Sequence, residues 1–242
     1  MSVLSIDGVT KTFRGFVAVD DVSLTIGDGE LRGLIGANGA GKSTLLHLIY
    51  GRVLPDAGAI RFGQTDVTMM PAHRRARLGM GLTFQVTSVF DDLTIEENLA
   101  LGAMPKGRGA SPAPGPEEIE RVLEMIELRD RRTALARELS HGEQQWLEIG
   151  MVLLTKPRLL LLDEPTSGMT RAESRRTAGL LRELQAEHAA DATVVVEHNI
   201  EFIRLVSDRV TVMHRGSVLA DGTVDEVQAN AEVQASYLGR RV

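Results

Sequence analysis

A glycine loop set between a strand and a helix constrains this chain more than any other feature. Residues 36–44 read GANGAGKST and match the phosphate-loop pattern GxxxxGK[ST]. They follow an apolar run at 31–35 that predicts a buried strand, and they lead into 45–50, which predict a helix ended by Gly51. A glycine-rich turn that met the pattern by chance would not need this strand and helix. The loop therefore predicts a site for phosphate groups.

The residue types in this loop suit phosphate chemistry. Glycines let the backbone curl so that successive N–H groups point inward, with the positive end of a helix behind them. Lys42 can reach the outer phosphates, and the Ser43 hydroxyl can bind a Mg²⁺ ion that bridges two phosphates. The predicted cradle consists of Gly36, Asn38, Gly39, Ala40, Gly41, Lys42, Ser43 and Thr44.

Two consecutive carboxylates follow a second apolar run. The leucines at 159–162 predict a strand covered on both faces, and Asp163 and Glu164 stand at its carboxyl end, where α/β sheets place ligand sites. Asp163 is suited to hold Mg²⁺ through water. Glu164 is suited to orient or deprotonate the water that attacks a γ-phosphate. The alternative is a pair of acids that only caps a strand, but the phosphate loop upstream favours nucleotide hydrolysis.

Size and charge narrow the class of protein. The chain has 242 residues, a formal net charge of −6 and no cysteine. Such a length supports one core or two closely packed lobes. We expect a soluble, cytoplasmic chain, because no apolar run approaches the ~20 residues that cross a bilayer. The negative charge argues against general nucleic-acid binding, and the lack of cysteine excludes disulfides and thiolate metal sites.

The order of the remaining elements predicts an α/β core interrupted by helices. Further strands are expected at 3–6, 22–26, 59–62, 81–85, 193–196 and 210–213, and further helices at 71–78, 94–101, 117–128 and 171–188.

Two further segments stand out by composition, one rich in glycine and proline and the other rich in basic residues. Residues 105–116 predict a flexible surface loop. The helix at 71–78 carries His73, Arg74, Arg75 and Arg77, which predict a solvated basic face.

The motifs together resemble the ATP-binding-cassette (ABC) ATPases. Residues 139–143 (LSHGE) stand at the signature position of that family, Gln85 at its Q-loop position and His198 at its switch-histidine position. All elements occur in the family's order and cover nearly the whole chain. The resemblance implies one nucleotide-binding domain over 1–242. Its P-loop NTPase (RecA-like) α/β core, with an N-terminal antiparallel β portion, would comprise 1–92 and 157–242, and its α-helical lobe 93–156.

The resemblance also implies roles and cofactors. ATP and Mg²⁺ would be bound, with Gln85 as a further Mg²⁺ ligand and with Glu164, His198, Gln85 and Lys42 as the catalytic set. Two cassettes of this family meet head to tail, so Ser140 and Gly142 would act on the nucleotide of a partner. Phe13 matches the aromatic position that stacks on adenine.

Each of these residues also has an ordinary structural role to consider. Ser140 and Glu143 have capping-box spacing, and a capped helix start is itself an anion site, so the two roles are compatible. His198 could be an ordinary histidine after a strand. Phe13 could be a core aromatic. Trp146 we assign to packing.

Two departures from the family pattern concern pairing. His141 and Glu143 stand where most members have glycine and glutamine, and Thr170 stands where an aspartate is usual. Thr170 and Glu173 have capping-box spacing, which explains the residue locally but removes a carboxylate from the expected contact between cassettes. We therefore expect a second cassette of a different kind as partner, with self-pairing as the alternative.

The branch of the family is indicated by short segments. Residues 139–151, 167–170 and 195–201 resemble the urea-transporter cassette most closely, with branched-chain amino-acid import as the nearest alternative. This resemblance implies membrane permease subunits as partners, a periplasmic solute-binding protein indirectly, and a place on the cytoplasmic face of the plasma membrane. A non-transport cytosolic ATPase and a binding module without turnover are further alternatives, and Glu164 argues against the second.

A docking surface for the permease is predicted at 85–90. Val86, Val89 and Phe90 would form an apolar patch beside the polar Gln85. The alternative is a small satellite core under the helical lobe.

Overall fold

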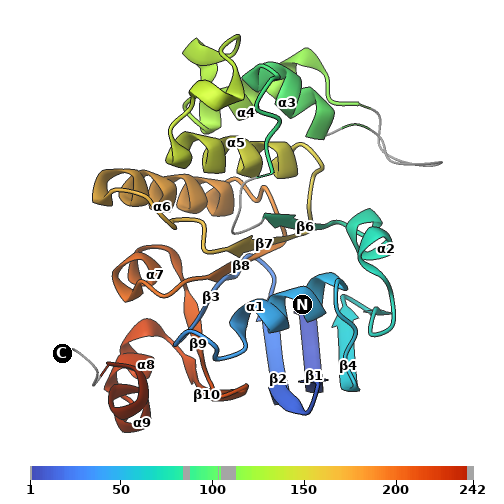
Figure 1. Ribbon diagram of the computed structural model, residues 1–242, viewed down its shortest axis with the longest axis vertical. Helices are drawn as coiled ribbons and strands as arrows, with labels where there is room; N and C mark the ends of the chain where they lie inside the picture. The colour runs from blue at the N-terminus through green and yellow to red at the C-terminus, as the bar shows by residue number, and fades with distance from the viewer. Residues whose placement is uncertain (1, 84–87, 103, 105–112, 239–242) are drawn as a thin grey trace.

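Two β-sheets organise the protein in the computed structural model, which describes residues 2–83, 88–102, 104 and 113–238 (Figure 1). In these residues one sheet has six strands in the order β10-β9-β3-β8-β7-β6, and the other has four in the order β2-β1-β4-β5. The strands are β1 Ser2–Phe13, β2 Phe16–Gly27, β3 Leu31–Gly36, β4 Ala57–Phe62, β5 Thr65–Asp66, β6 Met80–Thr83, β7 Leu159–Asp163, β8 Ala192–Val196, β9 Arg209–His214 and β10 Ser217–Gly222.

Helices surround these sheets. The α-helices are α1 Lys42–Tyr50, α2 Ala72–Arg77, α3 Ile95–Gly102, α4 Pro116–Met125, α5 His141–Leu153, α6 Arg171–Ala186, α7 Ile200–Val206, α8 Val224–Ala229 and α9 Ala231–Val233. Short 3₁₀ turns lie at η1 Arg129–Arg131 and η2 Ala136–Glu138, and a π-turn at η3 Gln234–Leu238. The sequence did not predict β10 or the elements α7, α8 and α9.

The larger sheet is parallel except at one edge. Strands β9, β3, β8, β7 and β6 run parallel, and β10 pairs antiparallel with β9. Leu160 and Leu162 of β7 pack into one core with α5 and α6, whereas Leu159 and Leu161 pack into a second core with α1, β1 and β2. The prediction of a strand covered on both faces is confirmed, because alternate leucines point to opposite sides of the sheet.

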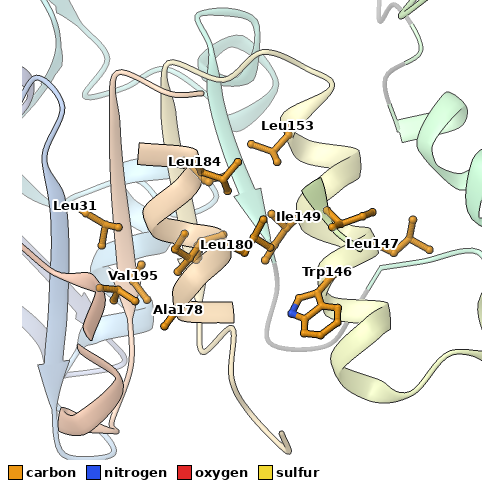
Figure 2. Close-up of a cluster of buried hydrophobic side chains, with 14 of the residues drawn as sticks. Leu31, Trp146, Leu147, Ile149, Leu153, Ala178, Leu180, Leu184 and Val195 are labelled. Carbon is orange, nitrogen blue, oxygen red and sulfur yellow. The ribbon is translucent and has the colours of Figure 1, made fainter. Parts of the chain in front are cut away.

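The upper part of the molecule in Figure 1 is the helical lobe, built by α3, α4 and α5 between β6 and β7 in the chain. Its helix starts follow the predicted caps: the Thr94 hydroxyl accepts from the Glu97 amide at 3.2 Å, and the Glu97 carboxylate accepts from the Thr94 amide at 2.8 Å. Trp146 of α5 is buried and donates from Nε1 to Oγ1 of Thr177 in α6 at 2.9 Å. Figure 2 shows this packed layer, and Trp146 serves packing as predicted.

The antiparallel sheet is longer than predicted. The first two strands were expected at 3–6 and 22–26, yet β1 and β2 pair along most of their length. They meet at a tight turn in which Arg14 has φ 47° and Gly15 has φ 86°. Register shifts along the pair accommodate the polar residues that interrupt the alternation, so the periodicity alone understated the strands.

The prediction that the basic residues of α2 are solvated is wrong at one position. Arg75 is fully buried, and its Nη1 donates to the carbonyls of Leu48 and Ile49 at 2.6 Å and 2.7 Å. Its other nitrogens donate to the carbonyls of Thr68 and Met70. Burial lowers the pKa of Arg75 to about 10, so it stays cationic at neutral pH at the negative end of α1.

The other basic side chains of α2 are exposed, as predicted. These are His73, Arg74 and Arg77. The contrast with Arg75 follows from the docking of α2 against the end of α1, which the charge pattern of α2 does not encode.

Candidate functional site

The glycine loop joins β3 to α1 at the carboxyl end of the central strand. Gly41 has φ 101°, and a Cβ atom placed on it would lie 2.4 Å from the carbonyl oxygen of Ala18 in β2. A Cβ on Gly36 would lie 2.3 Å from the carbonyl oxygen of Met213 in β9. The loop is therefore pressed against strands of both sheets, and only glycine fits at these two positions.

Lys42 is the buried cation of this loop. It is 5 % exposed, and its Nζ donates to the carbonyls of Gly36 and Ala37 at 2.8 Å and 3.1 Å. Burial lowers the pKa of Lys42, against the opposing pull of nearby carboxylates. The first turn of α1 contains no acidic residue, so the positive end of the helix dipole adds to the Lys42 charge. The start of α1 thus has the charge and the free N–H donors that suit an anion.

Asp163 connects the end of β7 to the glycine loop. It is 6 % exposed, and its Oδ1 accepts from Oγ of Ser43 at 3.4 Å. Burial raises the pKa of Asp163, and the neighbouring charge of Glu164 adds to the effect. A hydroxyl and a carboxylate oxygen at this spacing fit Mg²⁺, which prefers oxygen ligands and takes the rest from phosphates and water. In the described part of the chain, no three acidic, histidine or cysteine side chains form a metal site by themselves.

Glu164 and His198 lie on neighbouring strand ends. Glu164 adopts φ 49° and donates its amide to the carbonyl of Val196 at 2.9 Å, which turns its side chain out of the β7 direction. Nδ1 of His198, after β8, lies 3.9 Å from Oε1 of Glu164. The structure thus brings Lys42, Asp163, Glu164 and His198 to one edge of the sheet.

Sequence reasoning missed a third carboxylate at this edge. Glu197 is fully buried, and its Oε1 accepts from the amide and the hydroxyl of Thr166 at 3.0 Å and 2.5 Å. The signal available in the sequence was an acid directly between an apolar strand and His198. Such a residue is easily taken for an exposed neighbour of the histidine.

The signature residues lie away from Lys42 within one chain. The Ser140 hydroxyl caps α5 by accepting from the Glu143 amide at 3.3 Å, which confirms the predicted capping box. A Cβ on Gly142 would lie 3.0 Å from the carboxylate of Glu173 in α6. Helices α5 and α6 belong to the core on one side of the sheet and α1 to that on the other (Figure 1).

The structure describes the residue at the adenine position but not the residue at the Q-loop position. Phe13 is 43 % exposed, which removes the core alternative, and Nζ of Lys11 lies 5.5 Å from its ring centroid. Gln85 and Val86 fall outside the described residues.

The segment 88–90, which follows the Q-loop position, is held to the helical lobe by hydrogen bonds. Asn98 of α3 accepts the Phe90 amide at 2.7 Å and donates to the Phe90 carbonyl at 3.0 Å. The Ser88 amide donates to Oε1 of the buried Glu148 in α5 at 3.3 Å. The side chain of Phe90 is 49 % exposed, and Val89 packs against the core of the lobe.

Comparison with known proteins decides the family. The model of the ABC transporter family matches residues 19–167. The chain belongs to this family. It is accordingly an ATPase cassette with the mixed α/β fold of such cassettes, and ATP or ADP is its nucleotide. A second model, described as branched-chain amino acid ATP-binding cassette transporter, matches residues 217–242.

Individual relatives cover almost the whole chain. It is 32 % identical over 250 residues to the high-affinity branched-chain amino acid transport ATP-binding protein BraF of Pseudomonas aeruginosa, covering 98 % of each. It is 34 % identical over 239 residues to the lipopolysaccharide export system ATP-binding protein LptB of Acidithiobacillus ferridurans, covering 98 % of this chain and 97 % of that one.

The fold also matches a solved cassette. The crystal structure of the ADP conformation of MJ1267, an ATP-binding cassette of an ABC transporter, superposes with a TM-score of 0.87 at 27 % identity. The match covers 99 % of this chain and 100 % of that one. Among the described helices of the cassette, none combines the length and apolarity that spanning a bilayer requires.

Proposed function

We propose that this cassette is the ATP-hydrolysing subunit of a bacterial ABC importer, with its own catalytic edge at the carboxyl ends of β3, β7 and β8. The observation that carries the proposal is the meeting of a buried lysine, a hydroxyl–carboxylate pair and a glutamate–histidine pair around one anion-binding helix start. Hydrolysis needs all three: a phosphate site, a place for Mg²⁺ and a group that acts on water.

The proposed roles follow from position. The loop amides and Lys42 bind the β- and γ-phosphates, because they provide N–H donors and a cation in a site with little water. Ser43 and Asp163 hold Mg²⁺, with Gln85 as a third ligand. The ion, when bound, neutralises phosphate charge. Phe13 stacks on the adenine.

The proposed water-activating pair is Glu164 and His198. Glu164 acts on the attacking water, since its carboxylate is partly exposed at the strand end while its backbone is fixed by β8. His198 lies beside it on the solvent side and donates to the γ-phosphate. The placement of both groups therefore depends on the carboxyl ends of β7 and β8.

The proposed assembly contains two cassettes and membrane permease subunits. ABC cassettes work with such subunits and dimerise. In this chain Ser140 and Gly142 lie at the start of α5, which packs on the other side of the larger sheet from α1 and its Lys42, and this fits action on a partner's nucleotide. Because Thr170 and His141 depart from the family pattern, we propose a different cassette as the preferred partner. The single domain spans 1–242, with 93–156 as the helical lobe.

The proposed solute is urea or a related short-chain amide, which rests on the likeness of 139–151, 167–170 and 195–201 to urea-transporter cassettes. Branched-chain amino acids are the second candidate, and a specific observation favours them: the match of residues 217–242 and the name of BraF. The LptB relative makes export an outcome to be tested. A solute-binding protein would reach the cassette only through the permease, from the periplasmic side. The cassette would then sit on the cytoplasmic face of the membrane.

The experiment is to purify the cassette with its untagged membrane partners and to reconstitute the complex in proteoliposomes. ATPase activity is then measured with urea, acetamide, leucine or no solute, together with the solute-binding protein that co-purifies. Stimulation by urea or acetamide alone supports the first candidate, and stimulation by leucine alone supports the second. Stimulation by none of them, with no solute-binding protein recovered, contradicts an importer role.

The permease contact is tested by crosslinking. A cysteine at Ser88 is unambiguous because the chain has no native cysteine. An adduct with the permease from position 88, and none from a cysteine at the exposed Arg74 on α2, supports docking beside Phe90. Absence of the adduct at position 88 contradicts it.

A further inference from the structure

Glu197 is a buried carboxylate at the catalytic edge to which the roles above give no task. It is fully buried, whereas His198 beside it is 58 % exposed at its side chain. Burying a carboxylate is costly unless hydrogen bonds and nearby cations compensate. Its contacts therefore show which parts of the site it holds together.

One carboxylate oxygen holds the loop that follows Glu164. Oε1 accepts from both the amide and the hydroxyl of Thr166, at 3.0 Å and 2.5 Å. Thr166 lies two positions after Glu164, in a turn that the Ser167 amide closes onto the Glu164 carbonyl at 3.0 Å. A shift of Thr166 would therefore move the backbone that carries the Glu164 side chain.

The other oxygen faces His198. Oε2 accepts from the His198 amide at 3.2 Å and lies 3.7 Å from Nδ1 of its ring. The Glu197 amide donates to the carbonyl of Leu34 in β3 at 3.2 Å, two residues before the glycine loop. One residue thus contacts the loop after β7 and the histidine after β8 through its side chain, and β3 through its backbone.

We infer that Glu197 is a positioning residue for hydrolysis, which fixes Glu164 and His198 relative to each other through Thr166; this rests on the proposed function. Glu197 contacts His198 directly and reaches the loop of Glu164 through Thr166, but it has no assigned contact with the phosphates or the attacking water. In-line hydrolysis depends on placement, and a displacement of about 1 Å can cost about 100-fold in rate. Glu197 should therefore act on turnover and leave nucleotide binding nearly unchanged.

The test uses paired substitutions in the cassette, assembled with the membrane partners that co-purify with it. Glu197→Gln keeps shape and one acceptor but places an amide where the His198 amide needs an acceptor. Thr166→Val removes the hydroxyl, whereas Thr166→Ser keeps it and removes only the methyl group. Glu30→Gln is the matched control, since Glu30 holds Arg32 in a pocket lined mainly by residues of β1, β2 and β4. For each variant, ATP affinity is measured by calorimetry, and kcat and KM by phosphate release.

We expect Glu197→Gln and Thr166→Val each to lower kcat about 10- to 100-fold, with KM and ATP affinity within about threefold of wild type. Thr166→Ser should recover most of the rate, and Glu30→Gln should keep wild-type kcat. Because both residues act through one contact, the double variant should be little slower than either single variant.

Several outcomes overturn the inference. These are a wild-type kcat in Glu197→Gln, equal rates for Thr166→Val and Thr166→Ser, or effects that multiply fully in the double variant. If Glu197→Gln does not fold, the Thr166→Val and Thr166→Ser pair decides by itself. A complex of the wild-type cassette with its co-purified partners that hydrolyses no ATP, or a Glu164→Gln variant of that complex with full activity, would instead contradict the proposed function.

Discussion

The glycine loop at 36–41 and the loop at 164–170 make the same kind of connection in different ways. Each leads from the carboxyl end of a parallel strand into a helix, from β3 to α1 and from β7 to α6. The first is closed by its own residues, since Lys42 donates to the carbonyls of Gly36 and Ala37. The second is held by a residue far along the chain, Glu197, which binds Thr166.

This difference separates binding from turnover. The side chain that closes the first loop is its own Lys42, so this loop can present donors to phosphate without a side chain from another strand, although its glycines lie against β2 and β9. A loop held by the next strand moves with that strand, so its side chains are aligned with His198. We therefore expect damage to the first loop to abolish binding and damage to the second to affect mainly hydrolysis.

The largest effect is expected for Lys42→Ala. The loop loses its buried cation over the phosphates, and ATP affinity measured by calorimetry should fall at least about 100-fold, as for loss of a charged contact in a dry site. Lys156→Ala is the control, because Lys156 is exposed and pairs with Glu118 on the surface. Equal affinities for the two variants would refute the assignment of the phosphate loop.

Next in size is Glu164→Gln in the second loop. The amide keeps the shape of the side chain but cannot accept a proton, so phosphate release should slow about 100- to 10,000-fold while ATP affinity changes little. Glu187→Gln, at the exposed end of α6, should leave turnover unchanged. Normal turnover in Glu164→Gln would mean that another residue acts on the water.

A smaller effect, on stability, should distinguish two glycines of the first loop. Gly39 and Gly41 both have positive φ, at 78° and 101°, but only a Cβ on Gly41 would meet a neighbour, Ala18. Alanine at a positive φ costs about 1 kcal/mol, and the contact should raise the loss of unfolding free energy in Gly41→Ala to about 3 kcal/mol. Urea unfolding measures both variants. Equal losses of unfolding free energy in the two variants would show that β2 shifts to make room for the added Cβ.

Asp163 directly precedes the second loop and accepts from Ser43, which follows the first loop, and its substitution should show the cost of burying it. Because its pKa is raised above the ordinary 3.8, the ionised form destabilises the nucleotide-free fold as pH rises through the raised pKa. Asp163→Asn should therefore melt higher than wild type at pH 7. The difference should vanish below the pKa of the unfolded chain. A lower melting temperature at pH 7 would mean that the bond from Ser43 outweighs burial.

The smallest effect concerns the end of the second loop and its partner. Thr170 caps α6 through Glu173, and aspartate caps equally well while restoring the carboxylate usual in the family. In a Glu164→Gln background with Mg-ATP, Thr170→Asp should tighten self-association a few-fold in sedimentation. Thr223→Asp, at the equivalent cap of α8, is the control. An unchanged self-association constant would mean that Thr170 is not the cause of weak self-pairing. His141 would then be the next residue to replace.

The sequence by itself determined the features that depend on neighbouring residues. The glycine loop, the leucine strand at 159–162 and the caps at Thr94, Ser140 and Thr170 each arise within a few positions, where spacing fixes which groups can meet. The conjunction of the loop with Asp163 and Glu164 was also predictable, because parallel strands end at the same edge of a sheet.

Only the tertiary structure decided how distant segments use their polar groups. Arg75 has the same sequence context as its exposed neighbours, and it is buried because α2 docks against the end of α1. Asn98 and Glu197 resemble ordinary helix and strand-end residues until the partner backbones of Phe90 and Thr166 are placed beside them. A buried polar group must find its partner wherever the packing brings one, and that choice is made by the fold as a whole.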